Sequence, residues 1–149
     1  MRIRRLVSAL LAVAAAGSVL VITEAPAQAA RRVCTSYTES LAYESGGVRF
    51  WIRRPSVGWN TWDLNCSLQV GDYAPGAIRA LQAAIRCSDG GLVAIDGVFG
   101  SQTRQGVVNV QTNRSVKVDG VYGPQTRGVM TFAIFKDNGI FADCNTYWG

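Results

Sequence analysis

The stretch Asp96-Gly97-Val98-Phe99-Gly100-Ser101-Gln102-Thr103-Arg104 returns 23 residues later as Asp119-Gly120-Val121-Tyr122-Gly123-Pro124-Gln125-Thr126-Arg127. A constant offset over nine positions indicates an internal repeat. Each copy predicts a tight turn that leads into a helix. The Asp carboxylate can accept hydrogen bonds from backbone N–H groups two residues on, and Gly adopts backbone angles that other residues resist. Gly-Ser or Gly-Pro then begins the helix, and Pro124 suits its first position.

Three helices are expected around these turns. The first covers 77–87 and has high helix propensity, with three apolar residues on one face: Ile78, Leu81 and Ile85. The second follows Thr103 and contains Gly106, which costs up to ~1 kcal/mol relative to Ala. The third runs from about Pro124 to Lys136 and ends at Asn138-Gly139.

The segment 31–66 differs from the rest by its aromatic residues and its alternation. Val48, Phe50 and Ile52 fall on one face of a predicted strand, and Arg49, Trp51 and Arg53 fall on the other. A turn at 55–58 and a returning strand at 59–64 complete the predicted hairpin. A two-stranded ribbon alone is marginally stable, so this one should lie on the next unit or be stapled to it.

The N-terminus has the pattern of a secretory signal peptide. A basic start is followed by an apolar stretch, and the small residues at 25–30 suit cleavage after Ala29 or Ala30. An uncleaved membrane anchor is the alternative, although the uninterrupted apolar core at 9–16 is short for a span of ~20 residues. A lipoprotein is disfavoured because Cys34 follows Arg-Arg-Val and not a lipidation site.

Charge and cysteine content narrow the class of protein. Without the predicted signal peptide the chain keeps 12 basic and 9 acidic residues, far from the dense basic stripe of a nucleic-acid binder. Four cysteines in an exported chain predict two disulfides with three possible pairings. Metal binding is the competing use, but the chain has no Cys-x-x-Cys spacing and no His, so we expect no metal and no cofactor.

Together, the first helix and both repeat turns resemble the peptidoglycan-binding domain family. The resemblance rests on 77–82, 96–103, 107–111 and 119–126, and it spans roughly 68–139. It implies a small three-helix wall-binding module. The sequence departs from the family pattern at Gly106 and Gly128, where Ala is usual, and at Ser101, where Pro is usual. The segments before and after this unit are similar to the cysteine-bearing extensions of small secreted actinobacterial proteins.

The expected fold class is therefore mainly α: a three-helix domain with an N-terminal β-hairpin extension, stapled by disulfides. The predicted divisions are a signal peptide at 1–29, a β-ribbon at 31–66, the binding domain at 67–140 and a tail at 141–149. An extended segment at 67–74 is long enough to run back along a helix that rises ~1.5 Å per residue. This reach favours Cys66–Cys87, which leaves Cys34–Cys144, each stabilising by ~2–4 kcal/mol.

The residue inventory argues against catalysis. A chain without His lacks the zinc clusters and Cys-His pairs of many wall hydrolases. A carboxylate pair remains conceivable at Glu39, Glu44 and Asp63, but a short ribbon offers little material for a substrate cleft. Glu39 and Glu44 are interpreted as solvated surface charges, and Asp96 and Asp119 as turn caps. We expect no enzyme activity.

Binding is the positive hypothesis, and two sets of residues are candidates for it. The first lies at the turns and helix starts: Phe99, Gln102, Tyr122, Gln125 and Thr126. Its alternative is that both aromatic rings fill the core, with the Tyr122 hydroxyl expected to show a polar edge. The second is the strand face formed by Arg49, Trp51 and Arg53, where Trp51 either stacks on a sugar or is buried under the tail.

The predicted function is non-catalytic binding of cell-wall peptidoglycan, through glycan and stem peptide, by a secreted or wall-associated monomer. Nucleic acid is not an expected partner, and neither is a membrane once the signal has been cleaved. The alternatives are a secreted structural or interaction protein that keeps the fold without binding the wall and, third, a small wall hydrolase. The structural turns are assigned to six residues: Asp96, Gly97, Gly100, Asp119, Gly120 and Gly123.

Overall fold

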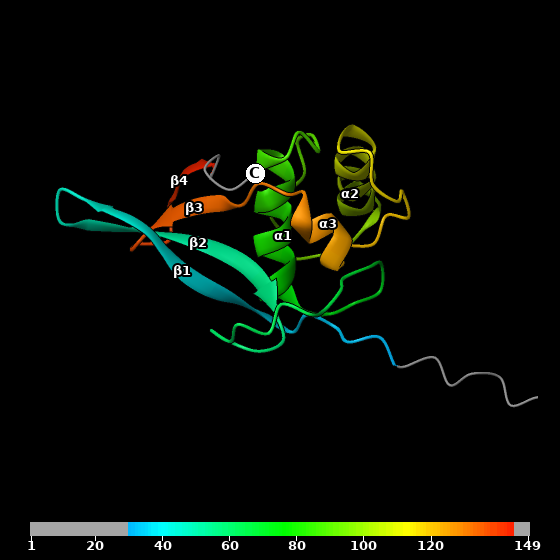
Figure 1. Ribbon diagram of the computed structural model, residues 1–149, viewed down its shortest axis with the longest axis horizontal. Helices are drawn as coiled ribbons and strands as arrows, with labels where there is room; N and C mark the ends of the chain where they lie inside the picture. The colour runs from blue at the N-terminus through cyan, green and yellow to red at the C-terminus, as the bar shows by residue number, and fades with distance from the viewer. Residues whose placement is uncertain (1–29, 145–149) are drawn as a thin grey trace, which may run out of the picture.

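A computed structural model describes residues 30–144, so the predicted signal peptide and the end of the tail lie outside the described residues. Strands begin and end this part of the chain, and helices occupy its middle (Figure 1). None of its helices is long and apolar enough to cross a membrane. The elements in chain order are β1 (Ser36–Ser45), β2 (Val48–Ser56), α1 (Pro75–Cys87), α2 (Ser101–Asn113), α3 (Pro124–Gly128), β3 (Ala133–Lys136) and β4 (Phe141–Cys144).

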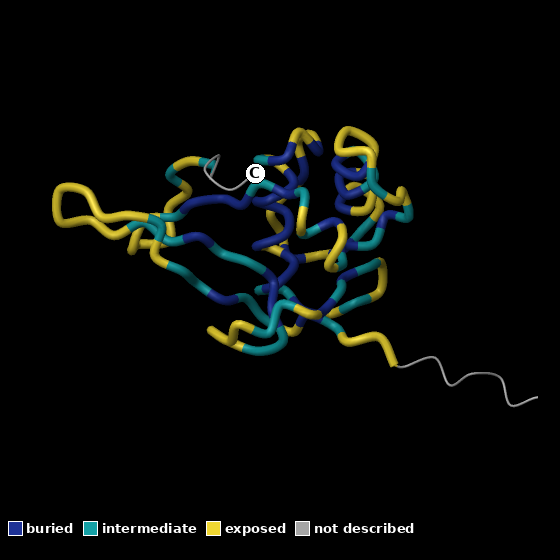
Figure 2. Tube along the Cα trace, in the orientation of Figure 1, coloured by how far each residue is buried: buried dark blue, intermediate teal, exposed yellow. Residues whose placement is uncertain are grey.

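The four strands form one antiparallel sheet in the order β1-β2-β3-β4. Trp51 pairs with Leu41 on one side and with Phe135 on the other, so β2 and β3 are the central strands. The β1–β2 hairpin projects away from the helices, and its end is exposed (Figures 1 and 2).

The predicted hairpin is right about the strand at 48–53 and wrong about its partner. β2 pairs with the segment before it, through a turn at Gly46 and Gly47. Both glycines have positive φ, 59° and 76°, which is the geometry that a tight hairpin turn needs. The segment 59–64, expected to be the returning strand, is a loop in which Asn60 itself has positive φ.

The expectation of a mainly α fold is wrong, because the sheet is as prominent as the helices. The predicted helix from Pro124 to Lys136 is cut to the five residues of α3, and its second half becomes β3. Met130, Phe132 and Ile134 are buried at alternate positions, and the small Ala133 between the last two is buried as well. A period of two suits a strand, and pairing with β2 overrides the helical interpretation.

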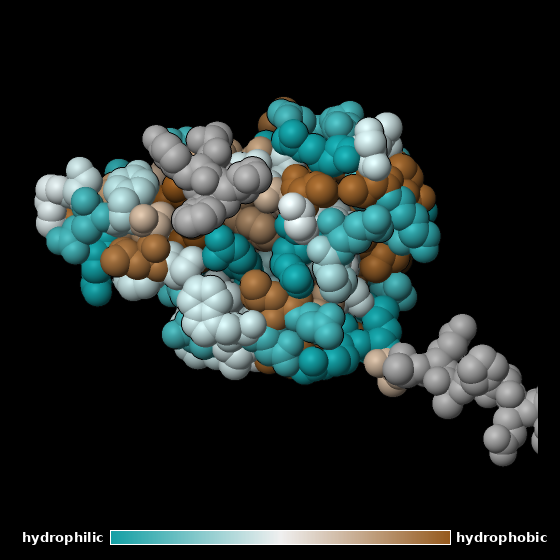
Figure 3. Space-filling model, in the orientation of Figure 1, coloured by the Kyte–Doolittle hydropathy of each residue, from teal (hydrophilic) through white to brown (hydrophobic). Residues whose placement is uncertain are grey.

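The core is centred on α1, which is buried on most of its surface (Figure 2). Leu81, Ala84 and Ile85 are completely buried, and they share one hydrophobic cluster with Val107 of α2 and Ile52 of β2. On the face shown in Figure 3, hydrophobic residues lie in small patches among hydrophilic ones. The sheet and the helices therefore bury a common core.

The two disulfides are Cys34–Cys66 and Cys87–Cys144, so the predicted pairing is wrong although all four cysteines are paired. Val33 and Ser67 form a parallel β-bridge, which sets Cys34 beside Cys66 with their Cα atoms 5.0 Å apart. Cys144, at the end of β4, then lies against the end of α1. Segment 67–74 is long enough to allow a Cys66–Cys87 disulfide. The β-bridge between Val33 and Ser67 instead brings Cys34 to Cys66 and so decides the pairing.

Candidate binding site

The first repeat turn is held by Gln82, a buried residue of α1. Its Nε2 lies 2.7 Å from Asp96 Oδ1, 3.1 Å from the Val98 carbonyl oxygen and 3.0 Å from Thr103 Oγ1. Its Oε1 accepts a hydrogen bond of 2.9 Å from the backbone N–H of Gly97. One amide side chain thus connects the acidic residue, the glycine and the helix that follows.

The second turn repeats the same network around Gln111 of α2. Its Nε2 lies 2.9 Å from Asp119 Oδ1, 3.0 Å from the Val121 carbonyl oxygen and 2.9 Å from Thr126 Oγ1. Its Oε1 accepts a bond of 2.9 Å from the Gly120 N–H. The repeat is therefore a structural device in which the preceding helix holds the following turn.

These contacts also set the protonation of the two aspartates. The backbone N–H of Val98 and the Gln82 amide lower the pKa of Asp96. Burial raises the pKa of Asp119, but the Val121 N–H together with Gln111 and Lys117 lowers it by more. Both carboxylates are thereby held in the acceptor form that the turns require.

Sequence reasoning missed Gln82 and Gln111. They are 29 residues apart, and so they fall outside the repeat of 23 that drew attention to the turns. Their signal is a polar residue on an otherwise apolar helix face: Gln82 lies one turn after Ile78 and beside Leu81. A buried amide needs hydrogen-bond partners, and the turns supply them.

The turn residues proposed as ligand contacts divide into buried and exposed ones. Phe99, Tyr122 and Thr126 are 3% exposed or less, so both aromatic rings fill the core and present no surface. The polar edge expected of Tyr122 is absent: its hydroxyl is buried and has no hydrogen-bond partner within residues 30–144. Only Gln102 and Gln125 lie at the surface, and Gln102 already accepts a hydrogen bond from the Ala94 N–H.

The strand face of Arg49, Trp51 and Arg53 is divided into two local clusters. Trp51 is half-buried and donates a hydrogen bond of 2.6 Å from Nε1 to Asp137, which follows β3. Arg49 lies 5.4 Å above the Trp51 ring and 3.4 Å from the same carboxylate. These hydrogen bonds from Trp51 and Arg49 lower the pKa of Asp137.

Arg53 belongs to the second cluster, on the part of the sheet nearest α1. Its guanidinium carbon lies 5.2 Å from the centre of the Tyr37 ring and 4.5 Å from that of Phe135, and its Nε is 2.8 Å from Glu39. Trp59 meets the Tyr37 ring edge-on at 4.9 Å. Glu39, predicted as a solvated charge, is thus a half-buried ion-pair partner.

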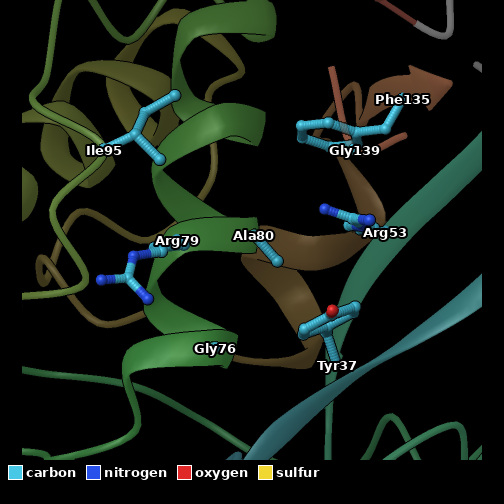
Figure 4. A pocket seen from close by; sticks show the side chains of 8 residues that line it. All are labelled: Tyr37, Arg53, Gly76, Arg79, Ala80, Ile95, Phe135 and Gly139. Atoms are coloured by element: carbon cyan, nitrogen blue, oxygen red, sulfur yellow. The ribbon is translucent and has the colours of Figure 1, made fainter. Parts of the chain in front are cut away.

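Three residues of this second cluster, Tyr37, Arg53 and Phe135, line one side of a cleft of about 360 Å³ between the sheet and α1 (Figure 4). Its other side comes from Arg79 of α1 and from Ile95, which precedes the first repeat turn. Gly76 and Ala80, one helical turn apart, separate the two sides with minimal side chains. The remaining lining residue is Gly139.

A second hollow, of about 290 Å³, lies at the start of the described chain near Pro124. Both of its arginines are already paired, Arg31 with Asp72 at 2.5 Å and Arg32 with Asp63 at 2.6 Å. Within residues 30–144 no three His, Cys, Asp or Glu side chains gather in a way that would hold a metal ion. The cleft beside α1 is the better candidate for a binding site.

Comparison with known proteins agrees with the resemblance seen in the repeat. Residues 75–130 match the family model described as a putative peptidoglycan binding domain. The match begins with α1, contains both repeat turns and ends two residues after α3. No curated protein and no solved structure matches the chain significantly. Residues 75–130, a little over a third of the chain, are thus similar to the peptidoglycan-binding domain family.

Proposed function

We propose that this protein is exported and binds cell-wall peptidoglycan without modifying it. The single observation that carries the proposal is the family match over residues 75–130, which supports peptidoglycan binding in general. The two repeat turns within residues 75–130 are each held by a buried glutamine, Gln82 in the first and Gln111 in the second.

Export is supported by the predicted signal peptide and by two disulfides, which persist in oxidising compartments outside the cytoplasm. The binding role is supported by a cleft that combines aromatic rings with cations, the mixture that ligand pockets commonly show. We propose glycan and stem peptide as the ligand, bound by a monomer at the bacterial surface.

Co-sedimentation tests this function. The chain from Ala30 to Gly149 is mixed at low salt with insoluble peptidoglycan or with cellulose as a matched insoluble polymer. It should pellet with peptidoglycan and be released by soluble muropeptides. Failure to pellet at low salt would exclude wall binding and favour the structural or interaction role. Release of dye from labelled wall, lost in Glu39→Gln or Glu44→Gln, would instead show a hydrolase.

A further inference from the structure

The charges around the cleft beside α1 are not balanced. On the sheet side, the Arg53 guanidinium is neutralised by Glu39 at 2.8 Å, and both side chains are 24% exposed. Across the helix, Arg79 makes no ion pair within 4 Å with any residue of the described chain, and its one hydrogen bond goes to the Asp96 carbonyl oxygen at 3.3 Å. Its charge also contributes to the lowered pKa of the Asp96 carboxylate, without a direct contact to it. Arg79 is therefore the cation that the cleft offers to a ligand.

The rest of the cleft suits the apolar face of a sugar ring. The rings of Tyr37 and Phe135 flank Arg53, and they line the cleft with it. Tyr37 also packs close to the helix, since a side chain added at Gly76 would meet its ring at 3.4 Å. In Figure 4, Arg79 extends from one side of α1 while Tyr37 and Arg53 lie on the other. A ligand that crosses Gly76 and Ala80 would reach both sides.

We infer that this cleft binds a saccharide that carries a carboxylate, with its ring against Tyr37 and Phe135 and its carboxylate on Arg79. The volume of about 360 Å³ lies at the lower end of the ~300–1,000 Å³ typical of ligand pockets. The inference rests on the proposed function and deepens it. It also gives the sheet a role, because residues outside the family match form half of the site.

The carboxylate of such a ligand has two sources in peptidoglycan: the lactyl group of a peptide-free muramyl residue, or the stem peptide. Three soluble probes separate them in an NMR titration of the ¹⁵N-labelled chain from Ala30 to Gly149. N-acetylmuramic acid carries the lactyl carboxylate, N-acetylglucosamine lacks it, and muramyl dipeptide carries its carboxylate at the end of the peptide. The amides of Gly76, Ala80 and Gly139 report on the cleft.

At least one of the two carboxylate probes should shift these amides to saturation. N-acetylglucosamine should bind about tenfold more weakly, because a charge-assisted bond to the guanidinium is lost. The stronger of the two carboxylate probes identifies the source. Equal binding of all three probes, or shifts confined to another surface, would overturn the inference.

Two variants of Arg79 and one control variant locate the cation. Arg79→Gln should weaken the stronger probe about tenfold, and Arg79→Lys should recover part of the loss, since the charge returns without the fork geometry. Arg104→Gln makes the same charge change at an exposed position on α2, outside the cleft, and should bind as the parent does. Equal affinity of Arg79→Gln and Arg104→Gln would refute the assignment.

The NMR titration of the cleft and the co-sedimentation test of the proposed function can fail independently of each other. If the parent chain pellets with peptidoglycan but the amides of the cleft do not shift, wall binding stands and the cleft is excluded. If the amides shift but the chain does not pellet, the cleft is a saccharide site and the wall-binding role fails.

Discussion

At the scale of single residues, Tyr122 has a hydroxyl group that is buried without a hydrogen-bond partner among the described residues. The first repeat turn has Phe99 at the same position, which shows that a ring without a hydroxyl suits this kind of site. The Tyr122 hydroxyl has no partner among the described residues, and burial raises its pKa far above the usual value. Leaving a buried hydroxyl unpaired costs ~1–3 kcal/mol.

Tyr122→Phe should therefore stabilise the fold by about 1 kcal/mol, because it removes the unpaired hydroxyl and keeps the ring. Urea unfolding followed by circular dichroism measures the change. Tyr43→Phe, which removes a hydroxyl from a side chain that is 44% exposed, is the matched control and should have little effect. A loss of more than ~1 kcal/mol in Tyr122→Phe would mean that the hydroxyl has a stabilising partner.

The two turn aspartates predict how stability depends on acid. The folded state lowers the pKa of Asp96 and of Asp119 below the value of ~3.9 expected in the unfolded chain. As the pH falls below about 4, the unfolded state takes up protons first, so the free energy of unfolding decreases. Above about pH 5 this contribution is fully present.

The double variant Asp96→Asn/Asp119→Asn keeps an acceptor oxygen in each turn but cannot titrate. Its free energy of unfolding should fall less steeply than that of the parent between pH 5 and pH 2.5. Some slope remains, because ion pairs and hydrogen bonds also lower the pKa of Asp63 and Asp137. Identical slopes in urea titrations of parent and variant would contradict the assignment.

The sequence predicted the turns at this scale, because Asp-Gly pairs act locally. The Gly97 φ of 82° and the Gly120 φ of 72° match the freedom attributed to them. Whether Phe99 and Tyr122 face the core or a groove depends on what packs over them. A local sequence pattern does not contain that information. Gln82 and Gln111 escaped notice because their partners lie 8 to 21 residues away.

At the scale of elements, Gly106 explains how α2 approaches α1. A Cβ at this position would lie 2.6 Å from Ile85 Cγ2 and 3.0 Å from Val93 Cγ1. Helix propensity alone favours Ala here by up to ~1 kcal/mol. Close contact between the helices reverses that preference.

Gly106→Ala should therefore lower the free energy of unfolding by about 1–3 kcal/mol, the usual cost of overpacking. Gly76→Ala is the matched change in α1, where the new Cβ meets the Tyr37 ring at an ordinary 3.4 Å. It should be neutral or stabilise by up to ~1 kcal/mol. Thermal unfolding of both variants checks this, and a stabilised Gly106→Ala would contradict the packing argument.

At this scale, the prediction of a helix from about Pro124 to Lys136 was wrong for a physical reason. Its apolar residues fit a helix and a strand about equally well over a short run, and the choice depends on a partner. That partner is β2, which lies far away in the sequence: Trp51 pairs with Phe135. The hairpin turn at Gly46 and Gly47 was within reach of sequence reasoning, since adjacent glycines are a known signal for it.

At the scale of the whole molecule, both ends of the described chain join one sheet that packs on the family unit. The ribbon at 31–66 was expected to lie on the next unit or to be stapled to it, and Cys34 and Ile52 belong to the common core. The beginning of the predicted tail is β4, which Cys144 ties to the end of α1. Such long-range contacts leave no local trace, so the disulfide pairing was not predictable from the reach of a segment.

Removal of the Cys87–Cys144 disulfide tests how far the sheet depends on this connection. The variant Cys87→Ala/Cys144→Ala should lose about 2–4 kcal/mol, since the bond closes a span of 57 residues in the unfolded chain. Urea unfolding of the parent and the variant under non-reducing conditions measures the difference. Unchanged stability would show that packing alone holds β4 in place.

The most direct test of the central claim is a binding isotherm on insoluble peptidoglycan, measured for the chain from Ala30 to Gly149. The pelleted fraction should rise to saturation with increasing peptidoglycan and fall again when soluble muropeptides are added. Salt should weaken binding, because the cleft presents an unpaired arginine to an anionic wall. A pelleted fraction that equals the one on cellulose, or that soluble muropeptides leave unchanged, would contradict peptidoglycan recognition.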